Sequence, residues 1–201
     1  EIININGEKY LKKDQSQKIK IGPSESMSKS KKNTIDPEKI ISDFGADSVR
    51  LFILSDSPPE KDVQWSDEGI VSSFKFLQKL WNLNSQILDE IQKDHKKDHD
   101  DLFDKMTNNF VDKVTNNLTK FTYNKIIANL HEMHSEISSI LKNNYSSKTI
   151  LNNYKKILVC MIPVTPHFAN ECISKFSDET QLKWPDIDKD MLLEENIKYV
   201  I

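Results

Sequence analysis

Serine and lysine side chains crowd one short segment of the chain. Residues 26–32 read Ser-Met-Ser-Lys-Ser-Lys-Lys, and Asp36-Pro37 follows with the composition of a helix start. Lysine ammonium groups attract phosphate, while hydroxyl and backbone N–H groups donate hydrogen bonds to its oxygens. The segment therefore predicts a mobile loop that wraps a triphosphate and neutralises the charge that develops on departing pyrophosphate.

This segment matches neither of two common nucleotide-binding motifs. The Gly-x-x-x-x-Gly-Lys-Ser/Thr spacing of a Walker loop is absent, and so is the Gly-x-Gly of a dinucleotide-binding turn. Between Lys9 and Lys32, eight lysines stand against two acidic residues, in a chain whose net charge is −3. The local excess favours a phosphate-facing element, although a solvated lysine-rich loop explains the charge equally well.

The elements that must position this loop are mainly helices. The chain has 201 residues, of which 37% are hydrophobic, with only 4 Gly and 7 Pro, and this composition disfavours an all-β protein. A short β hairpin or pair of edge strands is predicted within residues 1–22, at 2–5 and 18–21. Two short helices follow the loop, one within 34–44 and one from about 47 to the residue before Pro58.

Apolar residues then recur at spacings of three and four, which predicts a bundle of four long helices. Ser66 caps the first, the run 93–101 is a charged connection, and the fourth extends from about 148 to 176 with bends at Pro163 and Pro166. Residues 183–186 form a turn-rich excursion. The β-like end at 198–201 indicates that the chain continues in a longer protein, and the start indicates the same.

No metal centre or membrane span is expected. Cys160 and Cys172 lack partners at ligand spacing and read as reduced core thiols of a cytosolic protein. His95 and His99 are interpreted as part of a solvated charge run rather than a metal pair. His131 and His134 are interpreted as partly exposed helix residues, because they lack the spacing that places two histidines on one ion. No apolar run approaches the ~20 residues that span a bilayer, and the start lacks the basic flank of a signal peptide.

The segment Ser26 to Ser30 resembles the KMSKS signature of class I aminoacyl-tRNA synthetases, and the likeness continues through Asn33 to Asp36-Pro37. Residues 44–52, Phe-Gly-Ala-Asp-Ser-Val-Arg-Leu-Phe, resemble the stem-contact region of the enzymes for Leu, Ile, Val or Met. Residues 57–70, with Phe76-Leu77 and Leu80-Trp81, are similar to leucyl-tRNA synthetases in particular. Residues 121–128 and 163–169 continue this likeness into the helical anticodon-binding domain of that family.

The resemblance implies a division of the chain into four parts. These are the end of the catalytic domain at 1–33, stem-contact helices at 34–64, the helical anticodon-binding domain at 65–182, and a linker with the start of a further domain at 183–201. It also implies a cytoplasmic, monomeric ligase that uses ATP with Mg to activate leucine to leucyl-adenylate and transfers leucine to tRNA(Leu).

By the same resemblance, Lys29 is the catalytic residue that stabilises pyrophosphate. The ATP-binding residues are those of the whole signature, Ser26, Met27, Ser28, Lys29 and Ser30. Ser26 stands where the family has its first lysine, so that charge is absent or comes from Lys31 or Lys32. Those two lysines are also candidate tRNA contacts, together with Arg50 and Trp65. For Arg50, a helical ion pair with Asp47 is an equally good interpretation.

The body of a synthetase is not present in these residues. There is no His-x-Gly-His and no Gly-rich nucleotide-binding unit, so the chain by itself is predicted to be unable to make leucyl-adenylate. Weak tRNA binding is expected, because the helical portion is acidic and has Arg50 as its single arginine. The alternative is a free-standing helical tRNA-binding or interaction module that retains the signature without catalysis.

Overall fold

The computed structural model describes residues 2–5, 8–20, 22–23, 25–56, 58–93, 101–143, 145–176 and 182–192. The chain forms two compact units, residues 1–36 and residues 37–201. The charged run 93–101 lies outside the described residues except at its two ends, and the β-like end 198–201 lies wholly outside them. The division into four domains stays a prediction.

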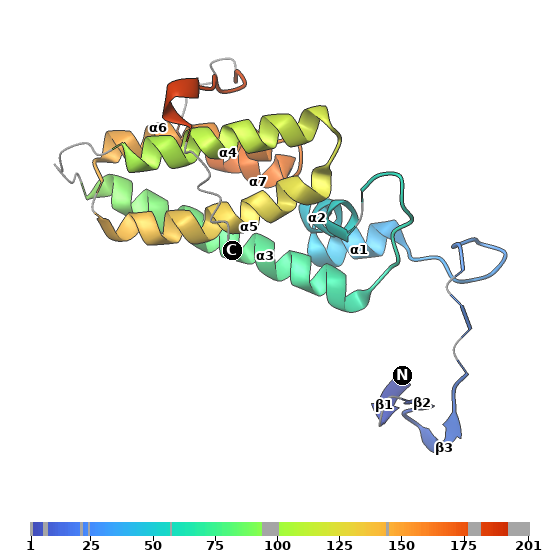
Figure 1. Ribbon diagram of the computed structural model, residues 1–201. Coiled ribbons are helices and arrows are strands. Elements are labelled where there is room, and N and C mark those ends of the chain that lie inside the picture. Colours follow the sequence, from blue (N-terminus) through green and yellow to red (C-terminus); the bar gives the residue numbers. More distant parts are fainter. Residues whose placement is uncertain are drawn as a thin grey trace, which may run out of the picture. The chain divides into compact units, whose positions relative to one another are not determined.

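The first unit contains a three-stranded antiparallel sheet with the order β1-β2-β3 (Figure 1). The strands are β1 Ile2–Ile5, β2 Glu8–Leu11 and β3 Asp14–Lys18. Ile3 pairs with Tyr10, which pairs in turn with Lys18 across a bulge. The sheet corrects the prediction of a second strand at 18–21. The middle strand was missed because Lys9 and Glu8 mask its weak alternation, and no described residue of the sheet is buried.

The two short helices after the loop begin and end where local signals place them. They are α1 Pro37–Phe44 and α2 Ala46–Asp56. Proline suits the first helical position because an N–H at that position would have no acceptor within the helix. Gly45 ends α1 in the left-handed region, with φ of 79°, and its amide donates to the Ile41 carbonyl at 2.8 Å.

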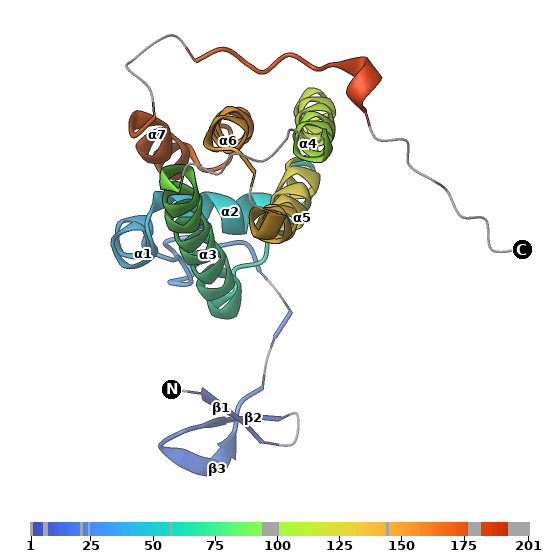
Figure 2. The same cartoon turned by 90° about the vertical axis from the view of Figure 1, so that its left-hand side faces the viewer.

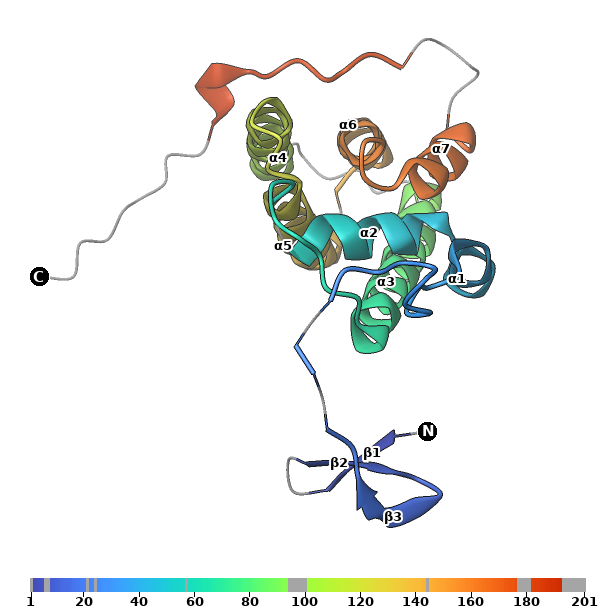
Figure 3. The same ribbon diagram turned by 90° about the vertical axis from the view of Figure 1, so that its right-hand side faces the viewer.

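The remaining helices form the bundle, which Figures 2 and 3 show nearly end-on with α2 lying across it. Their bounds are α3 Asp67–Gln92, α4 Leu102–Thr119, α5 Tyr123–Ile140, α6 Ser147–Met161 and α7 Pro166–Ser174, with short 3-10 turns η1 Leu141–Asn143 and η2 Lys189–Met191. The predicted cap is confirmed, since the Ser66 hydroxyl accepts from the Gly69 amide at 3.1 Å. The mainly helical fold class is likewise confirmed.

The predicted fourth helix is in fact two helices. α6 ends at Met161 and α7 begins at Pro166, because Pro166 has no N–H to continue the helix and its ring displaces Thr165 from helical geometry, to φ −126° and ψ 66°. The turn between them folds α7 back against α6. The prolines therefore terminate the helix rather than bend it.

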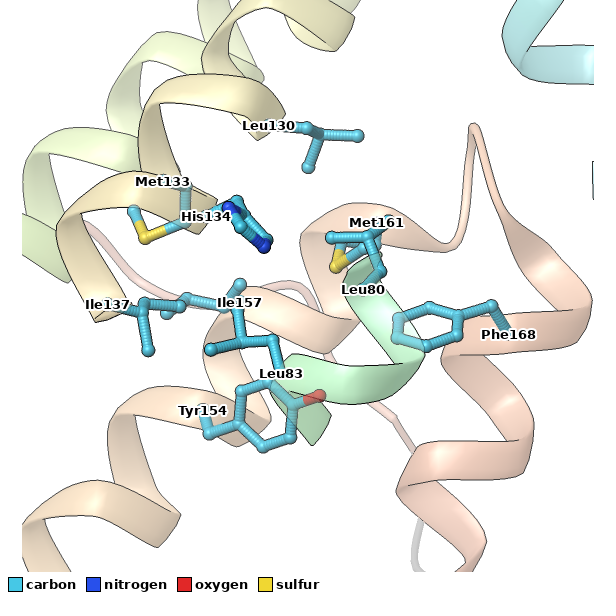
Figure 4. A pocket seen from close by; sticks show the side chains of 10 residues that line it. All are labelled: Leu80, Leu83, Leu130, Met133, His134, Ile137, Tyr154, Ile157, Met161 and Phe168. Carbon is cyan, nitrogen blue, oxygen red and sulfur yellow. The ribbon is translucent and has the colours of Figure 1, made fainter. Parts of the chain in front are cut away.

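The core runs through the middle of the bundle and is made of aliphatic, aromatic and sulfur-containing side chains. It retains a small apolar cavity of about 10 Å³, bordered by Met133, His134 and Met161 (Figure 4). Cys160 and Cys172 are free and buried, as predicted. Burial raises the pKa of the Cys160 thiol to about 12 and of the Cys172 thiol to about 11, so both are protonated and unreactive at neutral pH.

Residues 182–192 lie along α4 as an extended strap that ends in η2. The Asn108 side chain accepts from the Asp188 amide at 2.8 Å and donates to the Asp188 carbonyl, and the Trp184 indole donates to the Thr115 hydroxyl at 2.9 Å. The strap thus replaces solvent over one face of α4. Within the described residues, no helix is both long and apolar enough to cross a membrane.

Candidate functional site

The serine and lysine loop is folded into two overlapping turns. The Lys31 amide donates to the Ser28 carbonyl and the Lys32 amide donates to the Lys29 carbonyl, each at 3.2 Å. Lys32 has φ of 53°, so the chain reverses in the left-handed region before it continues toward α1. Lys29 lies within both turns, and its carbonyl accepts one of the two hydrogen bonds.

Asn33 braces the base of the loop from inside. Its Oδ1 accepts from the Ser28 amide at 2.9 Å, and its Nδ2 lies 3.4 Å from the Ser26 carbonyl. The Ser28 hydroxyl lies 3.1 Å from that of Ser30 and accepts from the Lys31 amide at 3.3 Å. Sequence reasoning gave Asn33 no role. The feature that could have indicated this role is its side-chain amide, which can donate and accept hydrogen bonds at once and stands just after the signature.

The lysines of the loop are not equivalent. Lys31 forms an ion pair with Glu25, with 2.9 Å between Nζ and Oε2. No carboxylate of the described residues lies within ion-pair distance of Lys29, whose side chain is exposed. An exposed pair such as Lys31–Glu25 contributes little free energy and exchanges readily with a phosphate. Among the described residues, Lys29 and Lys32 are therefore exposed lysines of the loop without a carboxylate partner, whereas Lys31 is paired with Glu25.

In the second unit, Asp47 of α2 caps α7, although the two lie far apart in the sequence. Its carboxylate is buried and accepts from the Phe168 amide at 2.7 Å and the His167 amide at 3.4 Å, and it lies 2.9 Å from the His167 Nδ1. Thr165, the N-cap residue of α7, makes no side-chain cap of its own. Asp47 supplies the missing acceptor, and its charge complements the positive end of the helix dipole. Sequence reasoning assigned this partnership to neither residue.

Arg50, one helical turn after Asp47 on α2, contacts the turn between α6 and α7. Its Nη2 donates to the Pro163 carbonyl at 2.6 Å and its Nε to the Val164 carbonyl at 3.1 Å. The structure therefore forms neither the proposed ion pair between Arg50 and Asp47 nor a guanidinium free of protein contacts. Both side chains join α2 to the α6–α7 turn. The role of Arg50 toward tRNA stays a prediction.

Trp65 is anchored in the segment between α2 and α3. Its indole N–H donates to Asp67 at 2.8 Å, and its ring packs edge-on against Phe52 with centroids 5.1 Å apart. Phe52 in turn lies against Gly69, where a Cβ would stand 2.5 Å from the ring. Trp65 is half-buried, so only part of its ring is available to RNA, and its predicted contact is untested.

An open hollow of about 340 Å³ lies between α2, α3 and α5, with His131 on its wall. The imidazole of His131 stacks on Phe76 with centroids 3.6 Å apart. Burial, with smaller effects of His134 and Lys79, lowers the pKa of His131. Within the described residues no three metal-ligating side chains gather, and His95 and His99 lie outside those residues.

Two family models match the chain. Residues 100–201 match the anticodon-binding domain of tRNA ligase, and residues 20–66 match tRNA synthetases class I (I, L, M and V). The first match covers the second half of the chain and the second covers the loop and α2. The chain belongs to the anticodon-binding domain family of class I tRNA ligases.

Individual relatives of the chain are leucine–tRNA ligases. The chain is 34% identical to a leucine–tRNA ligase of Nitrobacter winogradskyi over 89% of its own length, and 36% identical to one of Bartonella henselae over 92%. It spans 23% and 22% of those proteins. The resemblance to leucyl-tRNA synthetases is thus confirmed.

A solved structure shares the fold. It is the ternary LeuRS–tRNA–LeuAMS complex of Agrobacterium radiobacter K84 agnB2, with a TM-score of 0.72 and 21% sequence identity. The likeness covers 84% of this chain and 23% of that one.

Proposed function

We propose that this chain is the part of a leucine–tRNA ligase that supplies the ATP loop and the tRNA-docking helices. The observation that carries the proposal is the 34% to 36% identity with leucine–tRNA ligases over about nine-tenths of the chain, loop included. In the reaction, the leucine carboxylate attacks the α-phosphorus of ATP, pyrophosphate leaves, and a tRNA hydroxyl then displaces AMP from leucyl-adenylate.

The loop geometry supports a role for Lys29 in the first step. Its ammonium has no carboxylate partner among the described residues, so it can move to the oxygens of the leaving pyrophosphate without breaking an ion pair. Charge that develops only in the transition state is the kind that such a group stabilises most. Ser28 and Ser30 offer hydroxyls beside it, and the turns at Ser28 and Lys29 fix their spacing.

The substitution at Ser26 bears on how the loop works. Its carbonyl is joined to Asn33, while its short side chain brings no charge. Lys31 can supply the missing positive charge by exchanging Glu25 for a phosphate, since the pair is exposed. Magnesium would accompany the phosphates of ATP and neutralise their charge.

The helical unit supports docking of tRNA(Leu) as a rigid body. α2 is fixed to the α6–α7 turn by Asp47 and Arg50, so the segment after the loop and the end of the bundle move together. The proposal extends to a cytoplasmic monomer whose leucine pocket lies in parts of the ligase beyond these residues. The isolated 201 residues are expected to be inactive.

Leucine-dependent pyrophosphate exchange by the full-length protein tests the proposal. Lys29→Ala should lower the exchange rate by at least about a hundredfold with little change in tRNA affinity, because it removes transition-state stabilisation. Lys39→Ala, at an exposed position in α1, is the matched control and should leave the rate unchanged. A protein that binds tRNA but shows no exchange would instead identify a non-catalytic tRNA-binding module.

A further inference from the structure

The corner between α4 and α5 exposes an aromatic ring on a backbone that disfavours it. Phe121 is 62% exposed and has φ of 55°, in the left-handed region. For a bulky L-residue this conformation costs free energy, whereas glycine or asparagine adopts it readily. Because the ring is mostly exposed, it also contributes little hydrophobic stabilisation to the fold. Folding stability therefore explains neither the identity nor the position of this residue.

The corner is held in one shape by hydrogen bonds on both sides of Phe121. The Phe121 amide donates to the Leu118 carbonyl at 3.0 Å, and the Thr122 amide donates to the Asn117 carbonyl at 2.9 Å. The Thr122 hydroxyl donates to the Asn117 side chain at 2.9 Å, and that side chain donates to Asn129 at 3.0 Å. The ring is thus presented to solvent by a fixed support.

The sequence around Phe121 is basic and aromatic in an otherwise acidic unit. Residues 113–131 contain three lysines and no acidic residue, whereas residues 37–201 as a whole carry 26 acidic residues against 20 lysine and arginine residues. Lys120 directly precedes Phe121 and Lys125 follows it by four residues, and both lysines are exposed. Tyr123 packs against one edge of Phe121, with centroids 6.3 Å apart at 61°.

We propose that this corner is an RNA-contact surface on which Phe121 stacks against an unpaired base of tRNA. Every base has a π face, so an exposed aromatic ring binds one without reading its sequence. Lys120 and Lys125 then neutralise the phosphates on either side of that base. The strain at Phe121 is understandable if the ring is used in the complex, because strained residues concentrate at functional sites.

Figure 1 shows the connection between α4 and α5 at the end of the bundle where α2 lies, and α2 packs directly against α5. The proposal rests on the proposed function for the identity of the RNA. It adds a specific contact that the likeness to known ligases does not assign.

The test compares tRNA(Leu) affinity and thermal stability in the full-length protein. Phe121→Gly removes the ring and relieves the left-handed strain together. It should weaken tRNA binding by at least about fivefold, the loss of one stacked base, while the melting temperature stays the same or rises. Phe121→Tyr should retain near-normal affinity. Leu102→Ala, at an exposed apolar residue at the opposite end of α4, is the matched control and should change neither quantity.

A second measurement tests the lysines. Replacing Lys120 and Lys125 by Gln should reduce the slope of log K against log salt by about 0.7 to 0.9 for each lysine. Equal tRNA affinity of Phe121→Gly and the unaltered protein would overturn the inference, as would a lower melting temperature with unchanged affinity. If the unaltered protein bound no tRNA, the proposed function would fail, and this inference with it.

Discussion

The carboxylate of Asp47 accepts a hydrogen bond from the amide of Phe168, 121 residues later in the chain, at 2.7 Å. This contact caps α7 from α2 and joins α2 to the start of α7. Removing it should leave a buried helix end without its acceptor, and unsatisfied buried donors are costly.

We therefore expect Asp47→Ala to lower the free energy of unfolding by about 3 kcal/mol. Asp47→Asn keeps one acceptor oxygen for Phe168 but loses the charge, and it should cost less. The measurement is urea unfolding followed by helical circular dichroism. Asp43→Ala, at an exposed residue of α1, serves as the control and should have almost no effect. Equal stabilities for Asp47→Ala and Asp43→Ala would contradict the assigned cap.

The second prediction concerns Gly69. At an exposed helix position, Gly→Ala stabilises a protein by about 1 kcal/mol, but here the new Cβ would stand 2.5 Å from the Phe52 ring. Overpacking should reverse the sign, so Gly69→Ala is expected to destabilise by about 1–3 kcal/mol. Adding Phe52→Leu should recover part of that loss, because the two changes share one contact. A simple sum of the two single effects would show that the contact is not the cause.

The histidines on α5 predict that the stability of the folded chain depends on pH. Burial lowers the pKa of His131 and also of His134, so the folded chain binds these protons less readily than the unfolded chain. Their contribution to stability is complete above the unfolded value of about 6.5 and declines as pH falls from there through the lowered folded pKa values. Unfolding by urea should therefore require less denaturant at pH 5 than at pH 7.

The double variant His131→Gln with His134→Gln isolates this effect. Glu136 lies on the same helix, and burial raises its pKa, which acts in the opposite direction because its contribution declines as pH rises. In this variant, the free energy of unfolding should decline less between pH 7 and pH 5. The contribution of Glu136 should remain. An unchanged decline would assign the dependence to other groups.

Asn33 provides a prediction about catalysis. Because its amide joins Ser28 to Ser26, its loss should loosen the loop without removing a charge. In the full-length protein, Asn33→Ala should slow pyrophosphate exchange by about tenfold, a smaller loss than for Lys29→Ala. Asn33→Asp keeps the acceptor for the Ser28 amide and should give an intermediate rate. A rate for Asn33→Ala equal to that of the unaltered protein would show that the brace is dispensable.

Local signals in the sequence predict most of the helical fold. The start of α1 at Pro37, its end at Gly45 and the cap of α3 at Ser66 all depend on residues within one or two turns of each other, and all three are confirmed. The signature around Lys29 is also contiguous, so it pointed to a class of ligase before any fold was known. The role of Lys29 in catalysis remains the prediction that the exchange assay tests.

Only the tertiary structure decided which residues meet. Nothing in the local pattern connects Asp47 with Phe168, or Arg50 with the Pro163 carbonyl, because those contacts exist only after α2 has packed against the α6–α7 turn. The strain at Phe121 is equally invisible, since a phenylalanine in the sequence reveals nothing of its φ. Helix periodicity reflects spacings of three and four residues, whereas these contacts depend on the path of the whole chain.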